Sequence, residues 1–407
     1  MDFQDSPAEI EFRAAARDFL RATAPPKGGA DDFTGAYQSG ALAESEYVKR
    51  CKEWQGTLAE HGWAGITWSA EYGGRGGTSL EAAIFAEEQS QFGVSNGIFA
   101  VGIGMAGPTI IAHGTADQQQ RFLPTLLRGE EVWCQLFSEP GAGSDMAGLS
   151  TRAVRDGDEW IVNGQKVWTS GAVHSDLGIL LARTDPEQPK HRGITYFLCD
   201  MSDPGFDVRP IRQINGQAHF NEVFLTEVHV PDDRVLGDAN AGWGVAMTTL
   251  SNERLLIGEG GGGMKCADLL RLATSLGRAD DPTVRQGLAA AFSRAEILRY
   301  LGMRVRTAAG RGTTPGAEAN IMKLFTASHL KLMGELALAI EGPSGMLAGS
   351  DAPVAGGWQH AFLSHPAIRI AGGSDEVQRN IIGERVLGLP GDIRVDKGLP
   401  FRELAKQ

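Results

Sequence analysis

Residues 133–145 combine an apolar run, a turn and a glycine-spaced loop, a pattern that could bind a flat polar ring or a phosphate. The apolar run is typical of a strand, which would end at the turn signal Pro140-Gly141. The loop after the turn carries Ser144, so it could present backbone N–H groups and a hydroxyl to a ligand in a concave site. An ordinary strand-to-loop turn has the same composition, so this stretch alone favours neither interpretation.

A second stretch places an aromatic side chain next to two hydroxyls. Asn163-Gly164 predicts a tight turn, and Trp168 is followed directly by Thr169 and Ser170. An aromatic plane beside hydrogen-bond donors is what a site for a conjugated ring needs. The alternative is that Trp168 belongs to the core, as a Trp on a strand usually does.

A third stretch, residues 258–263, matches the G-x-G-x-x-G pattern of dinucleotide-binding loops. That pattern is informative only between a strand and a helix of a βαβ unit. Here it follows a segment with helical spacing, so we do not expect a Rossmann-type site.

Composition and charge exclude several classes of function. The chain has 407 residues, a net charge of −12 and an apolar fraction of 42%, which predict two or three packed units and argue against nucleic acid or an anionic membrane surface as a general partner. The nine histidines have no ligand spacing and the four cysteines form no C-x-x-C pair, so we expect no metal and a reducing compartment. The acidic first residues and the lack of a long apolar run predict a cytoplasmic protein without signal peptide or membrane span.

Hydrophobic spacing divides the chain into helical, β and helical regions, which we place at residues 1–130, 131–237 and 238–407. Helices are expected at 79–92, 118–127, 284–306, 317–339 and 377–387, and the long ones suggest a bundle. Strands are expected at 151–154, 159–162, 177–182, 193–199, 206–211 and 220–230. A hairpin turn at Asp156-Gly157 would join the first two strands.

Two features of the N-terminal region concern packing. Ile10, Phe12, Ala16, Phe19 and Leu20 are spaced as one buried helical face. Residues 93–107 are unusually rich in small side chains, which leave room either for a neighbouring helix or for a ligand. The sequence does not decide between these two interpretations.

The stretches at 133–145 and 163–171 together resemble the acyl-CoA dehydrogenase family, and the resemblance covers nearly the whole chain. It continues through Tyr72-Gly73-Gly74, residues 190–194, residues 228–231 with Gly242-Trp243, and residues 373–382. The resemblance implies a mainly α fold with an N-terminal helical domain, a middle β-barrel and a C-terminal four-helix bundle. It also implies FAD as cofactor, an acyl-CoA substrate, and an electron-transfer flavoprotein as electron acceptor.

The resemblance also implies which residues bind the cofactor. Cofactor contacts are expected at Gln135, Leu136, Phe137, Ser138, Gly143, Ser144, Trp168, Thr169, Ser170, Ser374 and Glu376. Trp168 would pack on the flavin ring, Ser170 would hydrogen-bond flavin N5, and Ser144 would also contact the thioester substrate.

The chain differs most informatively from the common family pattern at the position of the catalytic base. Most members place a glutamate where this chain has Gly372, and glycine cannot act as a base. A second group, the isovaleryl- and long-chain-type enzymes, places the glutamate before an arginine on the first bundle helix, which matches Glu253-Arg254. Without the resemblance, such a pair is usually a solvated surface pair. With it, Glu253 is the expected base, and Ser251, Arg254 and Gly372 join Ser144 as expected substrate contacts.

Other departures concern the phosphate and adenine end of the cofactor. The family's Arg-x-x-Phe-Gly loop is replaced by residues 275–282, so Arg278 or Arg285 would have to substitute for its arginine, and Ala339 replaces a recurring glutamine. These departures resemble a bacterial subgroup that acts on steroid side-chain thioesters and often combines two unlike subunits. We therefore expect either a homo-oligomer, such as a tetramer, or a heterotetramer with a related subunit. Two alternatives stay open: an acyl-CoA oxidase on the same fold, or a non-catalytic subunit of a heteromeric enzyme.

Overall fold

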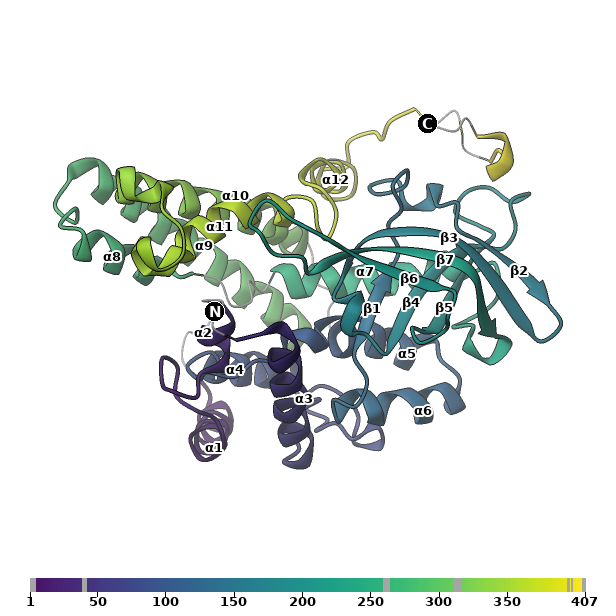
Figure 1. Ribbon diagram of the computed structural model, residues 1–407, viewed down its shortest axis with the longest axis horizontal. Helices are drawn as coiled ribbons and strands as arrows, with labels where there is room; N and C mark the ends of the chain where they lie inside the picture. The colour runs from purple at the N-terminus through teal and green to yellow at the C-terminus, as the bar shows by residue number, and fades with distance from the viewer. Residues whose placement is uncertain are drawn as a thin grey trace. The chain divides into compact units, whose positions relative to one another are not determined.

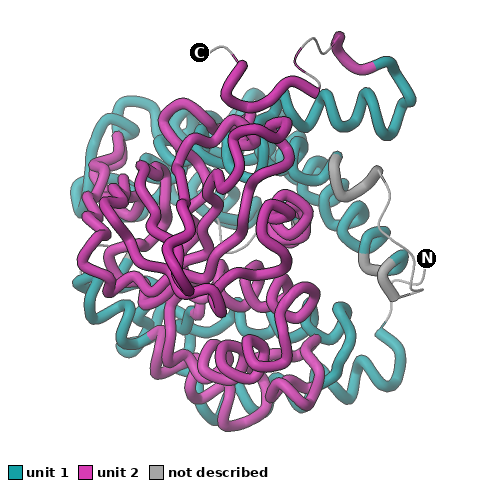
Figure 2. Tube along the Cα trace, turned by 90° about the vertical axis from the view of Figure 1, so that its right-hand side faces the viewer, with its two compact units in different colours: residues 1–50, 76–95, 254–390 teal, residues 51–75, 96–253, 391–407 magenta. Residues whose placement is uncertain are grey.

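The computed structural model describes residues 5–38, 42–258, 264–310, 317–393, 396 and 398–404 (Figure 1). The glycine-rich run at 259–263 lies outside these residues. The chain forms two compact units: residues 1–50, 76–95 and 254–390 make the first, and residues 51–75, 96–253 and 391–407 make the second (Figure 2). Two of the boundaries between the units fall inside helices, one in α3 (Glu44–Glu60) and one in α7 (Gly242–Gly258).

The first unit is helical. Its helices are α1 (Pro7–Thr23), α2 (Phe33–Gln38), α4 (Ser79–Gln89), α8 (Cys266–Ser275), α9 (Pro282–Gly310), α10 (Ala317–Glu341), α11 (Gly357–Ile368) and α12 (Asp375–Ile381). Helix α10 packs against α8, α9, α11 and α12, around a core that includes Leu272, Met333 and Trp358. The long helices expected from the sequence are thus confirmed, except that the last one is an α-helix only to Ile381 and continues as a π turn.

Helix α1 begins at a capping box in which the Ser6 and Glu9 side chains each bond the other's backbone N–H. Its buried face consists of Phe12, Ala16 and Leu20. Ile10 was expected on this face but is 58% exposed, so that expectation was wrong. Positions 12, 16 and 20 repeat every four residues along one stripe of the helix, and residue 10 lies to the side of that stripe.

The second unit is built on one seven-stranded sheet. Its strands are β1 (Trp133–Leu136), β2 (Arg152–Asp156), β3 (Glu159–Ser170), β4 (Leu177–Arg183), β5 (Ile194–Asp200), β6 (Phe206–Ile211) and β7 (Phe220–Pro231). The order is β1-β4-β2-β3-β7-β6, and β5 also pairs with β4. The long strands β3 and β7 curve strongly, so the sheet is curled (Figure 1). The mainly α fold with a middle β unit is confirmed.

The boundaries of most strands follow the expected ones closely because turn residues set them, but β3 continues to Ser170 instead of ending at 162. Gly157, with φ of 64°, closes the expected hairpin between β2 and β3. The tight turn expected at Asn163-Gly164 is wrong, because both residues lie inside β3 at a register shift opposite β7. Glycine is needed there for close packing instead, since a Cβ on Gly164 would lie 2.4 Å from Thr151 Oγ1.

Helices α5 (Gly107–His113) and α6 (Ala116–Leu127) pack beneath the sheet in the second unit. At two of the small residues between 93 and 107, the space left by the missing side chain is filled. A Cβ on Gly102 would lie 2.5 Å from Leu126 Cδ1, and one on Gly107 would lie 2.2 Å from Trp68 Cζ2. At these two glycines the space is therefore taken by neighbouring side chains rather than left for a ligand.

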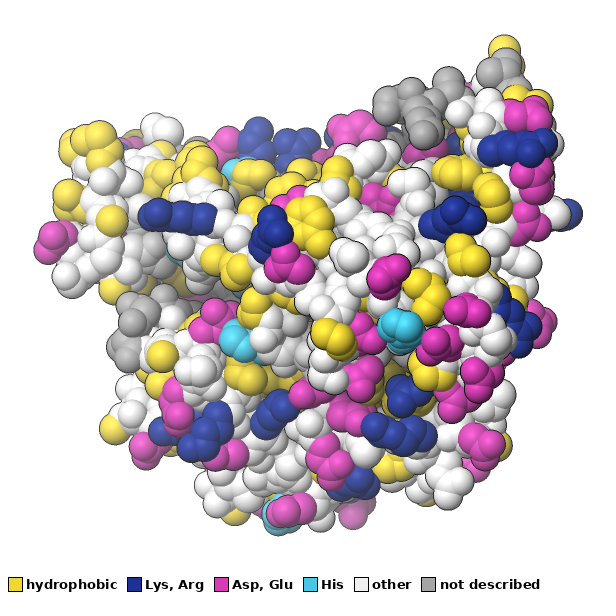
Figure 3. Space-filling view, turned by 45° about the vertical axis from the view of Figure 1, so that its right-hand side comes forward, with side chains coloured by type: hydrophobic (Ala, Val, Ile, Leu, Met, Phe, Trp, Pro, Cys, Tyr) yellow, Lys and Arg dark blue, Asp and Glu magenta, His cyan; other side chains and the backbone are white. Residues whose placement is uncertain are grey.

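The surface carries both signs of charge. On the face shown in Figure 3, acidic and basic side chains are interspersed and do not gather into one large basic patch. None of the helices in the described part of the chain has both the length and the apolarity needed to cross a membrane.

Candidate active site

Two of the segments expected to contact the cofactor lie side by side in the second unit. Gln135 and Leu136 end strand β1, and Phe137 and Ser138 follow it directly. Ser138 O accepts a hydrogen bond from the backbone N–H of Val167 in β3, at 2.9 Å. The ring-contact segment 135–138 is thereby tied to the start of the second one, residues 168–170.

Trp168 sits on a β-bulge that turns its side chain outward. The pairing of β3 with β7 shifts register between Lys166 and Thr169, and Trp168 takes a left-handed φ of 63°. Its side chain is 59% exposed and meets Phe220 edge to face, with ring centroids 6.0 Å apart. The alternative that Trp168 belongs to the core is therefore wrong, because the bulge reverses the alternation of the strand.

The residues on either side of Trp168 are held from the interior. Thr169 is buried, and its carbonyl accepts a hydrogen bond of 2.9 Å from the side-chain amide of Asn221. Ser170 is exposed and pairs with Phe220 in the β3–β7 ladder. The bulge thus presents an indole and a hydroxyl on the same outward-facing stretch.

A buried group of charges lies under these two segments and was not anticipated from the sequence. Lys166 is fully buried, and its ammonium donates to Phe137 O at 3.1 Å and to Glu139 Oε1 at 2.9 Å. Glu139 also accepts hydrogen bonds from the backbone N–H groups of Ser150 and Thr151, at 2.7 and 2.9 Å. Burial alone would raise the pKa of Glu139, but the Lys166 charge and these donors outweigh it and lower the pKa to about 2.

Arg183 is the third buried charge of this region. It hydrogen-bonds backbone carbonyls of loops rather than a carboxylate. Its guanidinium donates to the carbonyls of Ala147, Lys190 and Arg192 at 2.7 to 3.0 Å. Burial lowers the pKa of Arg183 to about 10. The aromatic ring of Phe401 covers the guanidinium at 3.9 Å.

The glycine loop after β1 is open to solvent. Gly143 and Ser144 are exposed, and a Cβ on Gly143 would meet nothing within 4 Å. The neighbouring Asp145 pairs with Lys190 at 2.9 Å, and Lys190 also pairs with Asp396 at 3.0 Å. The loop therefore has free space for a ligand on one side and an ion pair that restrains it on the other.

The expected base reaches the first ring-contact segment. Glu253 on helix α7 is half-buried, and its Oε2 lies 3.4 Å from Gln135 Nε2. One turn earlier, the buried hydroxyl of Thr249 bonds Tyr196 Oη and Thr109 Oγ1, both at 3.0 Å. These two hydrogen bonds hold helix α7, which carries Glu253, at a fixed position along its axis relative to Tyr196 and Thr109. Ser251 lies on an exposed face of α7, where its hydroxyl donates to Met247 O.

The remaining expected residues belong to the first unit. Gly372 and Gly373 have left-handed φ angles of 65° and 89°, and their carbonyls accept hydrogen bonds from Gln378 at 2.9 Å and from the buried Lys323 at 2.6 Å. Ser374 caps helix α12, and its hydroxyl accepts from the Val377 N–H. Lys323 and Asp375, which also pair with each other at 3.7 Å, are a second buried charge pair that the sequence did not reveal.

Glu376 and Arg254 complete the residues of the first unit. Glu376 is exposed and lies 3.5 Å from Arg379 on the next turn of α12. Arg254 is half-buried and follows Glu253 directly on α7. The structure thus brings Glu253, residues 135–138 and residues 168–170 together within the second unit, and holds Gly372, Ser374 and Glu376 in one loop-and-helix segment of the first.

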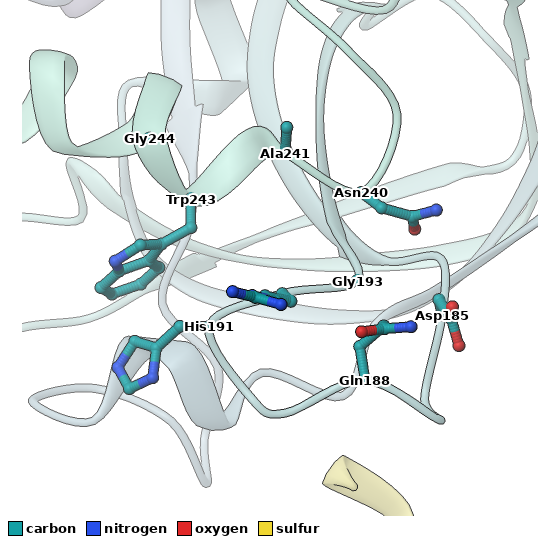
Figure 4. A pocket seen from close by; sticks show the side chains of 9 residues that line it. Asp185, Gln188, His191, Gly193, Asn240, Ala241, Trp243 and Gly244 are labelled. Carbon is teal, nitrogen blue, oxygen red and sulfur yellow. The ribbon is translucent and has the colours of Figure 1, made fainter. Parts of the chain in front are cut away.

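A pocket of about 370 Å³ opens elsewhere in the second unit (Figure 4). His191 and Trp243 form its aromatic end, with ring centroids 4.9 Å apart, while Asp185, Gln188 and Asn240 line the other end. The loop from 185 to 193 is held against the last described segment of the chain, because Phe401 N–H donates to Gln188 O at 2.8 Å and Pro400 bridges Pro189.

Three family models match the chain. They are those of the N-terminal, middle and C-terminal domains of acyl-CoA dehydrogenases, over residues 6–130, 134–228 and 240–387. The chain belongs to the acyl-CoA dehydrogenase family. It is 38% identical over 392 residues to "Acyl-CoA dehydrogenase IpdE1" of Mycobacterium tuberculosis, with 94% of this chain and 98% of that protein covered. It is 40% identical to "Acyl-CoA dehydrogenase FadE34" of the same organism, over 83% of this chain and 46% of that longer protein.

Solved structures of acyl-CoA dehydrogenases share the fold. A structure described as "Tcur3481-Tcur3483 steroid ACAD" is 31% identical with a TM-score of 0.83, over 96% of this chain and 100% of that one. The "ChsE4-ChsE5 complex from Mycobacterium tuberculosis" is 28% identical with a TM-score of 0.79, again over 96% and 100%. These likenesses span the whole described fold of this acyl-CoA dehydrogenase.

Acyl-CoA dehydrogenases are flavoproteins, and the residues of the second unit fit FAD. An outward-facing indole at Trp168, the exposed Ser170 hydroxyl and the open backbone at Gly143 are the aromatic face and the donors that a flavin and its phosphates need. The fit is poorer for Arg278, one of the two arginines considered as substitutes at the phosphate end. Its guanidinium already donates to Asp281 at 3.1 Å and to Ile340 O at 3.3 Å.

Proposed function

We propose that this acyl-CoA dehydrogenase catalyses the FAD-dependent conversion of an acyl-CoA thioester to the 2-enoyl-CoA, with Glu253 as the base. The observation that carries the proposal is the contact between Glu253 and Gln135, which joins a carboxylate to the segment assigned to the flavin ring. In this family member, Gly372 stands at the position where most members have the basic glutamate. Glu253 is the glutamate at the alternative position for the base, on the first bundle helix.

The role of Glu253 is to accept the proton from the carbon next to the thioester carbonyl. A carboxylate becomes a stronger base when substrate excludes water from it, and half-burial on α7 prepares Glu253 for that change. The amide of Gln135 limits where the carboxylate can point. The backbone N–H of Gly372 is assigned to the thioester oxygen, where a donor stabilises the charge that develops as the proton leaves.

The residues that would hold FAD are those of the two ring-contact segments and the C-terminal loop. They are Gln135, Leu136, Phe137, Ser138, Gly143, Ser144, Trp168, Thr169, Ser170, Ser374 and Glu376. When bound, the flavin would supply the acceptor for the hydride that leaves the β-carbon (C3) of the acyl chain. Ser144, Ser251 and Arg254 would bind and orient the thioester, so that its α-carbon (C2) faces Glu253.

The substrate and partners are proposed from the relatives. We infer that the acyl group is a bulky, steroid-derived side chain, because a steroid enzyme is among the similar structures. Two of these structures contain paired subunits, so we infer that this chain works as a heterotetramer with a related chain. We place this assembly in the cytoplasm. A homotetramer is the competing assembly. An electron-transfer flavoprotein is the inferred electron acceptor.

Anaerobic bleaching of the flavin tests the proposal. The purified protein is titrated with CoA thioesters from short straight chains to steroid-derived acids, and Glu253→Gln and Asp158→Asn are tested in parallel. We expect bleaching by wild type and by the Asp158 variant, whose altered side chain is exposed on the β2–β3 hairpin, and a loss of about 10²- to 10⁴-fold in rate for Glu253→Gln. Full bleaching by Glu253→Gln would refute the base assignment.

The same samples separate the alternative functions. A wild-type protein that binds no flavin would be a non-catalytic subunit, which is the alternative that the engaged Arg278 favours. Rapid reoxidation of the bleached flavin in air, with release of peroxide, would identify an acyl-CoA oxidase instead of a dehydrogenase.

A further inference from the structure

The buried charges at Lys166 and Glu139 need an explanation other than stability. Lys166 is 0% exposed and Glu139 is 6% exposed. Removing two charges from water costs several kcal/mol each, and apolar residues of similar volume are often as stable as such a pair. A core position in this sheet would therefore be filled at least as well by a methionine as by Lys166.

The contacts of the pair show what an apolar side chain could not do. Lys166 links strand β3 to the backbone of Phe137 and to the side chain of Glu139, both of which follow β1. Glu139 in turn bonds the backbone N–H groups of Ser150 and Thr151, at the entrance to β2. One ion pair thus connects three stretches of backbone: strand β3, the segment after β1 and the entrance to β2.

The pair also lies at the point where the strained bulge begins. Lys166 is the last residue in register before the shift, and Trp168 follows two positions later with φ of 63°. A left-handed backbone costs an L-residue roughly 1–2 kcal/mol, so it persists only where its flanks are fixed. Lys166 fixes one flank, and the bond from Asn221 to Thr169 O fixes the other.

We propose that Lys166 and Glu139 are positioning residues that set the spacing between segment 135–138 and the Trp168 bulge before FAD binds. The proposal rests on the proposed function, since both segments are assigned to the flavin ring. A site that is already ordered does not spend binding energy on ordering its own loops, so the pair acts on cofactor affinity rather than on folding. Neither residue needs to touch the cofactor for this role.

The test compares a single variant with a charge-neutral double variant. Lys166→Met keeps the stem but leaves Glu139 as an unpaired buried charge, whereas Lys166→Met with Glu139→Gln removes both charges and keeps an acceptor for the N–H of Thr151. Arg209→Met is the control, because Arg209 pairs with Asp207 on an exposed stretch of β6. Thermal unfolding of the apoprotein and FAD affinity are measured for each, in the assembly in which wild type binds flavin.

We expect the double variant to recover most of the apoprotein stability lost by the single variant, while its FAD affinity stays about 10-fold or more below wild type. The flavin absorbance bands should also shift, because Trp168 no longer lies at a fixed distance from the ring. Wild-type affinity and spectrum in the folded double variant would overturn the proposal and leave the pair a purely structural role.

A measurement on the wild-type chain covers the case in which neither variant folds. Hydrogen exchange of the Val167 N–H, which bonds Ser138 O, is followed with and without FAD. Positioning in advance predicts that this amide is protected to a similar degree, within about 10-fold, in both states. Protection that arises only with FAD would refute the proposal, whereas a wild-type chain that binds no FAD at all would refute the proposed function instead.

Discussion

The side-chain amide of Gln135 lies 3.4 Å from the carboxylate of Glu253, although 118 positions separate the two residues in sequence. This contact joins the end of strand β1 to helix α7. A hydrogen bond of this length is weak, so its main effect is on orientation: it restrains the carboxylate that would remove the proton.

Replacing Gln135 should therefore affect the chemical step more than binding. We expect Gln135→Leu to lower kcat about 10-fold with little change in KM, because an interaction with a charged group is worth roughly 1.5 kcal/mol at its weaker end. Steady-state turnover with an artificial electron acceptor gives both values. Gln165→Leu is a matched control, since it removes another glutamine–glutamate contact, to Glu222, on the same sheet. Equal effects of the two substitutions would contradict the prediction.

Two substitutions at Trp168 separate the strain of the bulge from the contact of the ring. Asparagine tolerates a left-handed φ and alanine does not, while both lose the edge contact with Phe220. We expect the Trp168→Asn apoprotein to be about 1 kcal/mol more stable than Trp168→Ala, measured by chemical denaturation. Both variants should bind FAD more weakly than wild type. A Trp168→Ala protein as stable as Trp168→Asn would mean that the bulge relaxes on its own.

Acid should remove the contribution of Glu139 over a defined range. Its folded pKa of about 2 lies below the ordinary value of 4.5, so its stabilisation is complete above pH 4.5 and is lost as the pH falls through 2. At about 1.4 kcal/mol per pKa unit, this amounts to roughly 3 kcal/mol. The difference in unfolding free energy between wild type and Glu139→Gln should therefore shrink between pH 4.5 and 2. A difference that is constant over this range would refute the low pKa.

Much of the fold was predictable because local signals determine it. Strands β4 to β7 begin and end within about a residue of the expected positions, since Pro, Gly and Asp clusters bound them. The turn expected at Asn163-Gly164 failed because that dipeptide signals a turn only when no neighbouring strand requires glycine, and Thr151 packs directly against it. A close contact between residues that are distant in sequence, such as Gly164 and Thr151, cannot be predicted from the local sequence.

The candidate site was predictable only in part, for related reasons. Family motifs indicate Trp168 and Glu253, but alternation along β3 would place Trp168 on the inner face with Trp160 and Val162, and only the bulge reverses it. The same alternation contains a signal for Lys166, which is in phase with those buried residues. A lysine at an inward-facing position indicates a buried partner, but the partner, Glu139, cannot be read from spacing.

Phe401 should stabilise the loop from 185 to 193 through Arg183. We expect Phe401→Ala to lower the unfolding free energy by about 1–2 kcal/mol, because the ring covers a desolvated guanidinium. Hydrogen exchange should rise in residues 186–193 and stay unchanged in β7. Leu399→Ala is the control, because Leu399 is exposed and lies on the same segment as Phe401. Equal exchange in the two variants would contradict the role of Phe401.

The ion pair under the two ring-contact segments has a consequence for anyone who redesigns the protein. A search for more stable sequences would exchange Lys166 and Glu139 together for apolar residues and replace Trp168 with asparagine or glycine, because these changes remove a buried charge pair and a strained backbone position. The product would be a robust scaffold that takes up its coenzyme poorly. These three positions should be held constant in any thermostabilised library, and screens should select for a yellow protein as well as for a heat-resistant one.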